Sequence, residues 1–158
     1  MQQGVQRTSL QDIADKLGIT KPALYYHFAS REDLVRSILV PLIDEGEQFV
    51  DEQERRGHVH PRELVEGYFD YHYRHRQDLM LVLAEIAMLA DLGLIDKVLA
   101  WRERLGKLVF GPKPTLAQAT RAVIAFGGLQ DCCLQFPDTP YKQLRARSVE
   151  AALAALGR

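Results

Sequence analysis

The stretch from Thr8 to Leu39, TSLQDIADKLGITKPALYYHFASREDLVRSIL, constrains the fold more than any other part of this chain. Ser9 and Asp12 form an S-x-x-D capping box, which predicts that a helix begins directly after Ser9. Gly18 predicts its end, because glycine adopts the left-handed C-cap conformation without steric cost. The spacing i, i+3, i+4, i+7 predicts one apolar face, made of Leu10, Ile13, Ala14 and Leu17.

A second, shorter helix is predicted after Thr20, which can cap it, with Pro22 tolerated in its first turn. Leu24 and Phe28, four residues apart, give this helix a narrow buried face. Ser30 and the aspartate three residues later form another S-x-x-D box and start a third helix. Two helices joined by a short glycine-containing turn indicate a helix-turn-helix.

The exposed side of the second helix indicates nucleic-acid binding. Its first turn carries no carboxylate, so its N-terminus can attract DNA phosphate. Tyrosine and histidine side chains offer donors for phosphate oxygens, while Lys21 and Ala23 could reach base edges. The plainer alternative is a solvated helix in an ordinary helical domain.

The run D-I-A-x-x-L-G-I-T-x-x-A-L-Y-Y-H-F-x-S-R-E-x-L resembles the DNA-binding domain of TetR-type transcriptional regulators, from Gly4 to Leu39. The resemblance implies that the helix from Lys21 to Phe28 enters the major groove of double-stranded operator DNA. Arg31 stands where the family commonly has lysine, so the charge is kept. The expected DNA-binding residues are Thr8, Thr20, Lys21, Pro22, Ala23, Tyr25, Tyr26, His27 and Arg31.

The same resemblance implies a whole helix before Gly4, and Met1 to Arg7 is too short to supply it. That helix would cover the face of Leu10, Leu17 and Phe28. Exposing a large apolar side chain costs about 1.5–3 kcal/mol. We therefore expect a helix-turn-helix that lacks the usual first helix and is weaker for it.

Composition excludes several classes of protein. The net charge of −1 does not point to nucleic acid, although a dimer with two small basic surfaces needs no basic whole. No apolar run approaches the roughly 20 residues that span a bilayer, and MQQGVQRTSL contains no signal-peptide core. The adjacent cysteines Cys132 and Cys133 cannot frame a disulfide scaffold. A cytoplasmic protein with no membrane partner is expected.

The rest of the chain predicts helices only. The expected segments are a kinked or broken helix from Arg31 to about Arg55 through Pro41, then Pro61 to about Arg76, Leu79 to Ala90, a helix from Asp96 to a stop at Gly111, Leu116 to Phe136, and Tyr141 to Leu156. The segment from Leu79 to Ala90 is apolar all round except Glu85, which predicts the centre of a bundle. The expected fold is all-α, with a DNA-binding domain over residues 1–40 and a ligand-binding and dimerisation domain over residues 41–158.

A ligand cavity in the second domain is implied by the resemblance, since aromatic and methionine positions at helical spacing are otherwise more often core. The expected lining is Tyr68, Tyr71, His72, Met80, Glu85, Met88, Trp101, Leu105, Phe126 and Gln130. These residue types suit a flat or amphiphilic organic ligand. Glu85 has two open interpretations: it lies on a solvent-facing edge, or it points into the cavity and orients a polar or cationic group.

Homodimerisation is expected on the last two helices, whose small residues allow close approach. The expected interface is Leu129, Cys132, Phe136, Leu144, Ala151, Ala152, Leu153 and Ala155.

No catalytic motif is present in the sequence, so neither an enzyme nor a cofactor is expected. A metal site could be drawn from His58, His60, His72 and His75, and the cysteine pair could sense oxidants. Surface histidines and buried helical cysteines are the commoner situations, and no metal is expected.

The expected function is a homodimeric transcriptional regulator, most simply a repressor. The resemblance implies that a small organic ligand would shift the helix after Arg31 and change the spacing of the two DNA-reading helices, whose half-sites lie about 34–36 Å apart. One alternative is a small-molecule-binding helical protein that no longer binds DNA. Another is a helical enzyme that uses Glu85 and the histidines.

Overall fold

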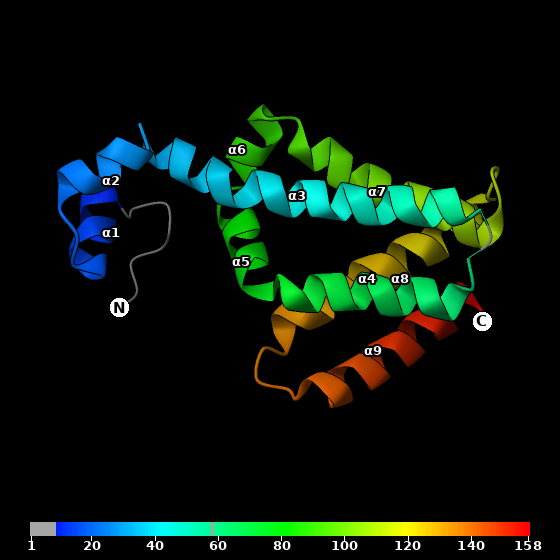
Figure 1. Cartoon of the computed structure of the whole chain (residues 1–158). Coiled ribbons are helices and arrows are strands. Elements are labelled where there is room, and N and C mark those ends of the chain that lie inside the picture. Colours follow the sequence, from blue (N-terminus) through cyan, green and yellow to red (C-terminus); the bar gives the residue numbers. More distant parts are fainter. Residues whose placement is uncertain (1–8, 58) are drawn as a thin grey trace.

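The computed structural model describes residues 9–57 and 59–158, and these residues form helices and connecting turns without a strand. The helices are α1 (Leu10–Leu17), α2 (Lys21–His27), α3 (Arg31–Arg56), α4 (Pro61–Arg74), α5 (Arg76–Ala84), α6 (Ile86–Asp91), α7 (Leu94–Phe110), α8 (Leu116–Gln135) and α9 (Tyr141–Leu156). The predicted all-α fold is confirmed. Helices α1 and α2 lie at one end of α3, beyond the bundle that α4, α7, α8 and α9 build along the rest of its length (Figure 1).

Local caps define the helix-turn-helix as predicted. The Ser9 hydroxyl accepts from the Asp12 amide at 3.2 Å, and the Asp12 carboxylate accepts from the Ser9 amide at 2.8 Å. Gly18 ends α1 in the left-handed conformation at φ 67°. The Thr20 hydroxyl caps α2 by accepting from the Ala23 amide at 3.4 Å. These contacts fix the two helices without any distant partner.

The apolar face of α1 is narrower than expected. Leu10 and Ala14 are buried with Leu24 of α2, and Ile13, Phe28 and Leu34 are partly buried against them. Leu17, which was expected on this face and without the cover of the usual first helix, is 64% exposed. Residues 1–8, which include Thr8 and the positions at which the usual first helix was expected to be lacking, are outside the described residues.

A single helix, α3, connects the helix-turn-helix of α1 and α2, called the reading end below, to the bundle. It is one helix through Pro41, which lies on its exposed side, so of the two expected forms, kinked or broken, the broken helix is wrong. Proline donates no amide hydrogen to the carbonyl of Ser37, and Ser37 is itself an exposed residue. Because α3 crosses residue 40, the two expected domains share one rigid element.

The bundle core is built mainly of large side chains from α3, α4, α7, α8 and α9. Leu39, Leu64, Leu105 and Phe126 are fully buried there. Gly46 permits the close packing of α3 on α7, because a Cβ at this position would overlap the Trp101 ring and lie 2.8 Å from the Tyr71 hydroxyl oxygen. The Tyr71 hydroxyl in turn donates to the Leu42 carbonyl at 2.8 Å.

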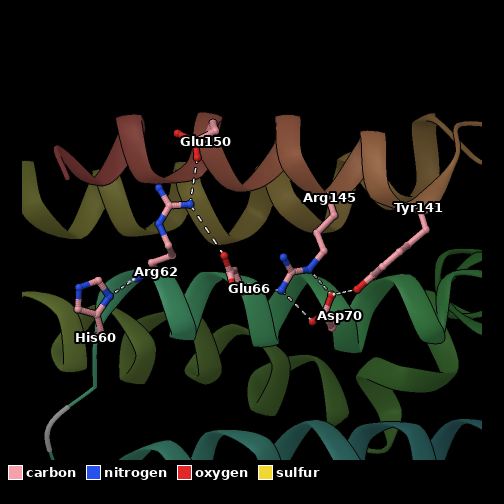
Figure 2. Close-up of polar contacts among 7 residues, drawn as sticks. All are labelled: His60, Arg62, Glu66, Asp70, Tyr141, Arg145 and Glu150. Atoms are coloured by element: carbon pink, nitrogen blue, oxygen red, sulfur yellow. Dashed lines mark hydrogen bonds and ion pairs between the residues drawn. The ribbon is translucent and has the colours of Figure 1, made fainter.

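A polar seam fastens α9 to α4 (Figure 2). Arg145 donates to Asp70 Oδ1 at 2.9 Å and to Glu66 Oε2 at 3.1 Å, and Tyr141 donates to Asp70 Oδ1 at 2.7 Å. Arg62 reaches Glu150 of α9 at 3.0 Å. A network of this kind gives orientation more than stability, because exposed ion pairs individually contribute little.

The segment from Leu79 to Ala90 departs from the prediction. The structure divides it into α5 and α6 at Glu85, whose backbone ends α5 at φ −113° and ψ 28°. It is not the centre of the bundle, since Met80 is 56% exposed and Leu83 is also exposed. The expectation failed because an apolar run without glycine or proline gives no signal for a break.

Candidate DNA-binding and ligand-binding sites

The exposed face of α2 gathers most of the residues predicted to contact DNA. Leu24 is buried, and its neighbours on the helix surface point into solvent, with Tyr26 86% exposed. The other exposed members are Thr20, Lys21, Pro22, Ala23, Tyr25 and His27. The first turn of α2 carries no acidic residue, as the sequence indicated. This face can therefore accept phosphate at the helix N-terminus without like-charge repulsion.

Contacts within this face organise its side chains. The Lys21 ammonium lies over the Tyr25 ring, 5.5 Å from its centroid. The rings of Tyr26 and His27 meet edge to face with centroids 5.1 Å apart. The face thus presents one cation, two phenol hydroxyls and one imidazole, which are groups suited to contact phosphates and base edges.

Arg31 lies at the first turn of α3, but its guanidinium forms an ion pair with Glu85 at the break between α5 and α6. Both carboxylate oxygens participate: Arg31 Nη2 donates to Oε1, and Nη1 donates to Oε2 at 3.3 Å. Glu85 is buried by this contact. Neither interpretation of Glu85 anticipated the ion pair, since its partner is distant in the sequence.

Several residues predicted to line a cavity meet inside the bundle as packed aromatic neighbours. The Tyr68 ring centroid lies 4.2 Å from that of His72 and 5.2 Å from that of Phe126. Tyr71 meets Trp101 edge to face at 6.3 Å. The Trp101 indole donates to Glu47 Oε2 at 2.6 Å. Tyr71 and Trp101 therefore both have structural partners on α3.

The remaining members of the predicted lining are dispersed. Leu105 is buried in the core, and Gln130 accepts from Arg102 at 2.9 Å. Met80 faces solvent, Glu85 pairs with Arg31, and the side chain of Met88 lies outside the described residues. The structure therefore brings together the residues of α4, α7 and α8, but not those of α5.

Burial controls the ionisation of the two polar rings in this cluster. It lowers the pKa of His72 to about 4, so this imidazole is neutral near pH 7. Its Nδ1 lies 3.0 Å from the Tyr68 carbonyl oxygen. Burial also raises the pKa of Tyr68 to about 12, against the opposing influence of the Arg102 cation.

A small pocket of about 170 Å³ opens between α7 and α8, next to this cluster. Its walls are mainly apolar, and Arg102 stands at its edge. Sequence reasoning missed Arg102, because a charged residue on an amphipathic helix is usually a surface residue. Its position one residue after the only tryptophan of the chain was the one available signal.

The residues predicted for dimerisation divide into two groups. Leu129, Leu144, Ala152 and Leu153 are buried within one protomer, whereas Phe136 and Ala151 are exposed and Cys132 and Ala155 are partly buried. A shallow groove of about 200 Å³ between α8 and α9 is bordered by several of them. Ile124, 64% exposed, borders the same groove and was missed.

Metal binding and thiol chemistry find little support. Among the described residues, no group of three or more potential ligands is arranged to hold a metal ion. His58 lies outside those residues. Burial raises the pKa of the Cys133 thiol to about 12, which keeps it protonated and unreactive. Within the described part of the chain, no helix is both long enough and apolar enough to cross a membrane.

Comparison with known proteins places the reading end among bacterial regulators. A sequence profile for bacterial regulatory proteins of the tetR family matches residues 1–38. The HTH-type transcriptional regulator TtgR of Pseudomonas putida is 36% identical over 58 residues, which are 37% of this chain and 28% of that protein. The HTH-type transcriptional repressor KstR2 of Mycobacterium tuberculosis is 42% identical over 43 residues, which are 27% of this chain and 22% of that protein. The chain thus matches only a minor part of these relatives' length.

Solved structures match nearly the whole chain. A transcriptional regulator from Aquifex aeolicus superposes with a TM-score of 0.70 at 21% identity, covering 92% of this chain and 86% of that one. The TetR family transcriptional regulator PfmR from Thermus thermophilus superposes with a TM-score of 0.66 at 21% identity, covering 96% of this chain and 89% of that one. At this identity the two structures establish the fold alone. The sequence matches show that residues 1–38 resemble bacterial regulatory proteins of the tetR family.

Proposed function

This chain belongs to the TetR family of transcriptional regulators, and from that premise we propose that it is a homodimeric repressor whose hold on operator DNA is released by a small organic ligand. The observation that carries the proposal is the exposed, acid-free face of α2. Its Leu24 anchor, Thr20 cap and bare first turn present Lys21 and Tyr25 to a DNA groove. No enzymatic role is proposed.

The Arg31–Glu85 ion pair supports the regulatory half of the proposal. Arg31 belongs to the expected DNA-contacting set, yet it pairs with a buried carboxylate where α5 meets α6. A ligand that moves α5 or α6 would therefore alter both the orientation of α3 and the availability of Arg31 for phosphate. Coupling between two sites requires such an element, whose arrangement both ligands bias.

Dimerisation is proposed on the α8–α9 face. Ile124 on α8 and Phe136 directly after α8 expose apolar area, and Ala151 and Ala155 border the same groove as Ile124. Two such helices from each protomer would form a two-fold-symmetric four-helix interface. Because Leu129 and Ala152 are buried within one protomer, a charge at either would unfold the chain. Ile124→Glu is the cleaner test, and it should give folded monomers with reduced operator affinity.

DNA binding is tested by fluorescence anisotropy with duplexes from the region upstream of the coding sequence and with unrelated duplexes. Tyr25→Phe should weaken binding to all duplexes several-fold, because it removes one phosphate donor worth about 1 kcal/mol. Lys21→Ala should change which duplexes are preferred, by about 1–3 kcal/mol of discrimination. Lys142→Ala, which removes an exposed lysine from α9, is the matched control and should change nothing.

Salt dependence decides the DNA-binding proposal. Affinity should fall steeply as salt rises, because phosphate contacts release counterions. Binding that is absent at low salt, or that Lys21→Ala and Lys142→Ala reduce equally, would contradict the proposal.

A further inference from the structure

Two arginines of α7, two positions apart, have very different surroundings. Arg104 forms ion pairs with Glu47, Asp51 and Glu54, so its charge is fully compensated. Arg102 has no carboxylate within ion-pair distance among the described residues. Its Nη2 donates to Gln130 Oε1 at 2.9 Å, and its buried Nε has no hydrogen-bond partner there. Arg104 therefore joins α7 to α3 through its ion pairs, whereas Arg102 is a partly buried cation with an N–H donor that has no partner among the described residues.

In the part of the chain that the structure describes, the polar neighbours of Arg102 supply neither a negative charge nor a hydrogen-bond acceptor for its Nε. The Tyr68 hydroxyl, on a side chain only 1% exposed, has no hydrogen-bonding partner that meets good geometry among the described residues. His72 is neutral near pH 7, so it neither compensates the guanidinium nor adds a second positive charge beside it. A buried donor without a partner loses its hydration without compensation. An anionic oxygen beside Arg102 would remove this cost.

An apolar pocket adjoins the cation. Leu99, Pro114, Ala119, Ala122 and Val123 form its walls, with Arg102 at its edge. Glu103 also borders it, but the carboxylate of Glu103 pairs with Lys107 at 2.6 Å. The guanidinium lies against α8 beside Gly127, where an added Cβ would be 3.5 Å from its Cζ, an ordinary contact distance. The volume of about 170 Å³ suits a ligand well below ordinary drug size, for which pockets run to about 300–1,000 Å³.

We propose that Arg102 and the α7–α8 pocket bind a small amphipathic carboxylate, with its head on the guanidinium and its short apolar body between Leu99 and Val123. The inference rests on the proposed function, because this anion would be the ligand that releases DNA. It narrows the ligand class from any organic molecule to an anion with a short apolar body.

The test compares octanoate with 1-octanol, which has the same chain length and no charge, by calorimetric titration of the full chain. Octanoate should bind saturably, with an affinity at least about tenfold above that of octanol, because a carboxylate forms charge-assisted hydrogen bonds with arginine. Equal affinities for the two probes, or no binding of octanoate, would overturn the proposal.

Variants locate the site. Arg102→Gln should weaken octanoate binding about tenfold and leave octanol binding unchanged, while Arg102→Lys should recover part of the loss. Lys97→Gln, which removes an exposed cation from the same helix, is the matched control. If Arg102→Gln and Lys97→Gln have equal effects, the carboxylate does not bind at Arg102.

A second variant avoids the partly buried arginine. Val123→Glu places a negative charge at an exposed position of the pocket wall and should also repel octanoate. Leu116→Glu introduces the same charge at an exposed position of α8 that is not among the pocket residues, and should leave binding intact. Octanoate binding that survives Val123→Glu would contradict the proposed pocket.

Failure of this inference is distinguishable from failure of the proposed function. DNA binding measured without octanoate tests the regulator alone. If octanoate binds at Arg102 but does not release operator DNA, the anion site is supported and the proposed ligand response is contradicted. If DNA binds and octanoate does not, the anion site falls and the DNA-binding proposal stands.

Discussion

The two ends of this molecule are stabilised in different ways. In the helix-turn-helix, Leu10, Ala14 and Leu24 are the buried apolar residues, and side-chain caps define the helix ends. In the bundle, large side chains of several helices are fully buried, and ion pairs join distant segments. Buried apolar area is the dominant favourable term in folding. The comparison therefore teaches that the reading end is locally specified and weakly held, whereas the bundle is held by burial.

The largest expected effect comes from the same substitution in both cores. Leu105→Ala should lower the free energy of unfolding of the bundle by about 3–5 kcal/mol, because the cavity lies among packed neighbours. Leu24→Ala should cost about 2–3 kcal/mol locally and abolish DNA binding, while the bundle stays folded. Thermal unfolding by circular dichroism and hydrogen exchange measure the two effects. A Leu24→Ala variant that lowers bundle stability as much as Leu105→Ala would break the comparison.

The bundle should also lose stability in acid through His72. Burial lowers its pKa from 6.5 to about 4, so the unfolded chain binds the proton first as pH falls. The contribution is fully present above about pH 6.5 and is lost as pH falls toward 4, by about 3 kcal/mol. Denaturant titrations at several pH values give the free energy of unfolding at each pH. This free energy should depend less steeply on pH in His72→Gln than in the wild type. The exposed His60→Gln serves as the control. The same pH dependence of the free energy of unfolding in the wild type and in His72→Gln would refute the burial argument.

Helix caps offer a matched pair of smaller effects. Thr20 caps α2 and Thr115 caps α8, each by accepting from the amide three residues later. Replacing either by alanine should cost about 1 kcal/mol. Thr20→Ala should weaken DNA binding, whereas Thr115→Ala should lower only the melting temperature. Equal losses of DNA affinity in the two variants would mean that the reading end and the bundle unfold as one unit.

The smallest expected effect lies where the two regions meet. Glu85→Gln removes the carboxylate charge that pairs with Arg31 and so removes one competitor of phosphate for this guanidinium. DNA affinity should rise roughly two- to fivefold, and the response to ligand should weaken. Glu63→Gln, at an exposed carboxylate of α4, controls for the lost negative charge. A decrease in DNA affinity for Glu85→Gln would show that the ion pair orients the reading end rather than competing with DNA.

Local signals in the sequence predicted the reading end residue by residue. The Ser9 box, the Gly18 stop and the Thr20 cap act within a few positions, so each appears in the sequence and in the structure. Periodicity placed Leu17 on the apolar face, and the expected lack of a covering first helix agrees with its exposure.

Pairings over long distances were beyond sequence reasoning. The Arg31–Glu85 ion pair and the exposed position of Met80 depend on how helices fold back on one another. The same holds for Arg102. The sequence suggests a surface residue, but in the fold its guanidinium lies near Tyr68 and donates to Gln130. The bundle was therefore predicted as a pattern of helices, and its candidate site only as a set of aromatic residues.

Hydrogen exchange of the full chain with and without operator DNA tests the central claim most directly, because it reports on every helix at once. DNA should slow exchange across α2 and the first turns of α3, where free-state protection is low, and leave α4 and α8 unchanged. Slower exchange confined to α4 and α8, or no change in α2, would contradict the claim that α2 is the DNA-reading helix.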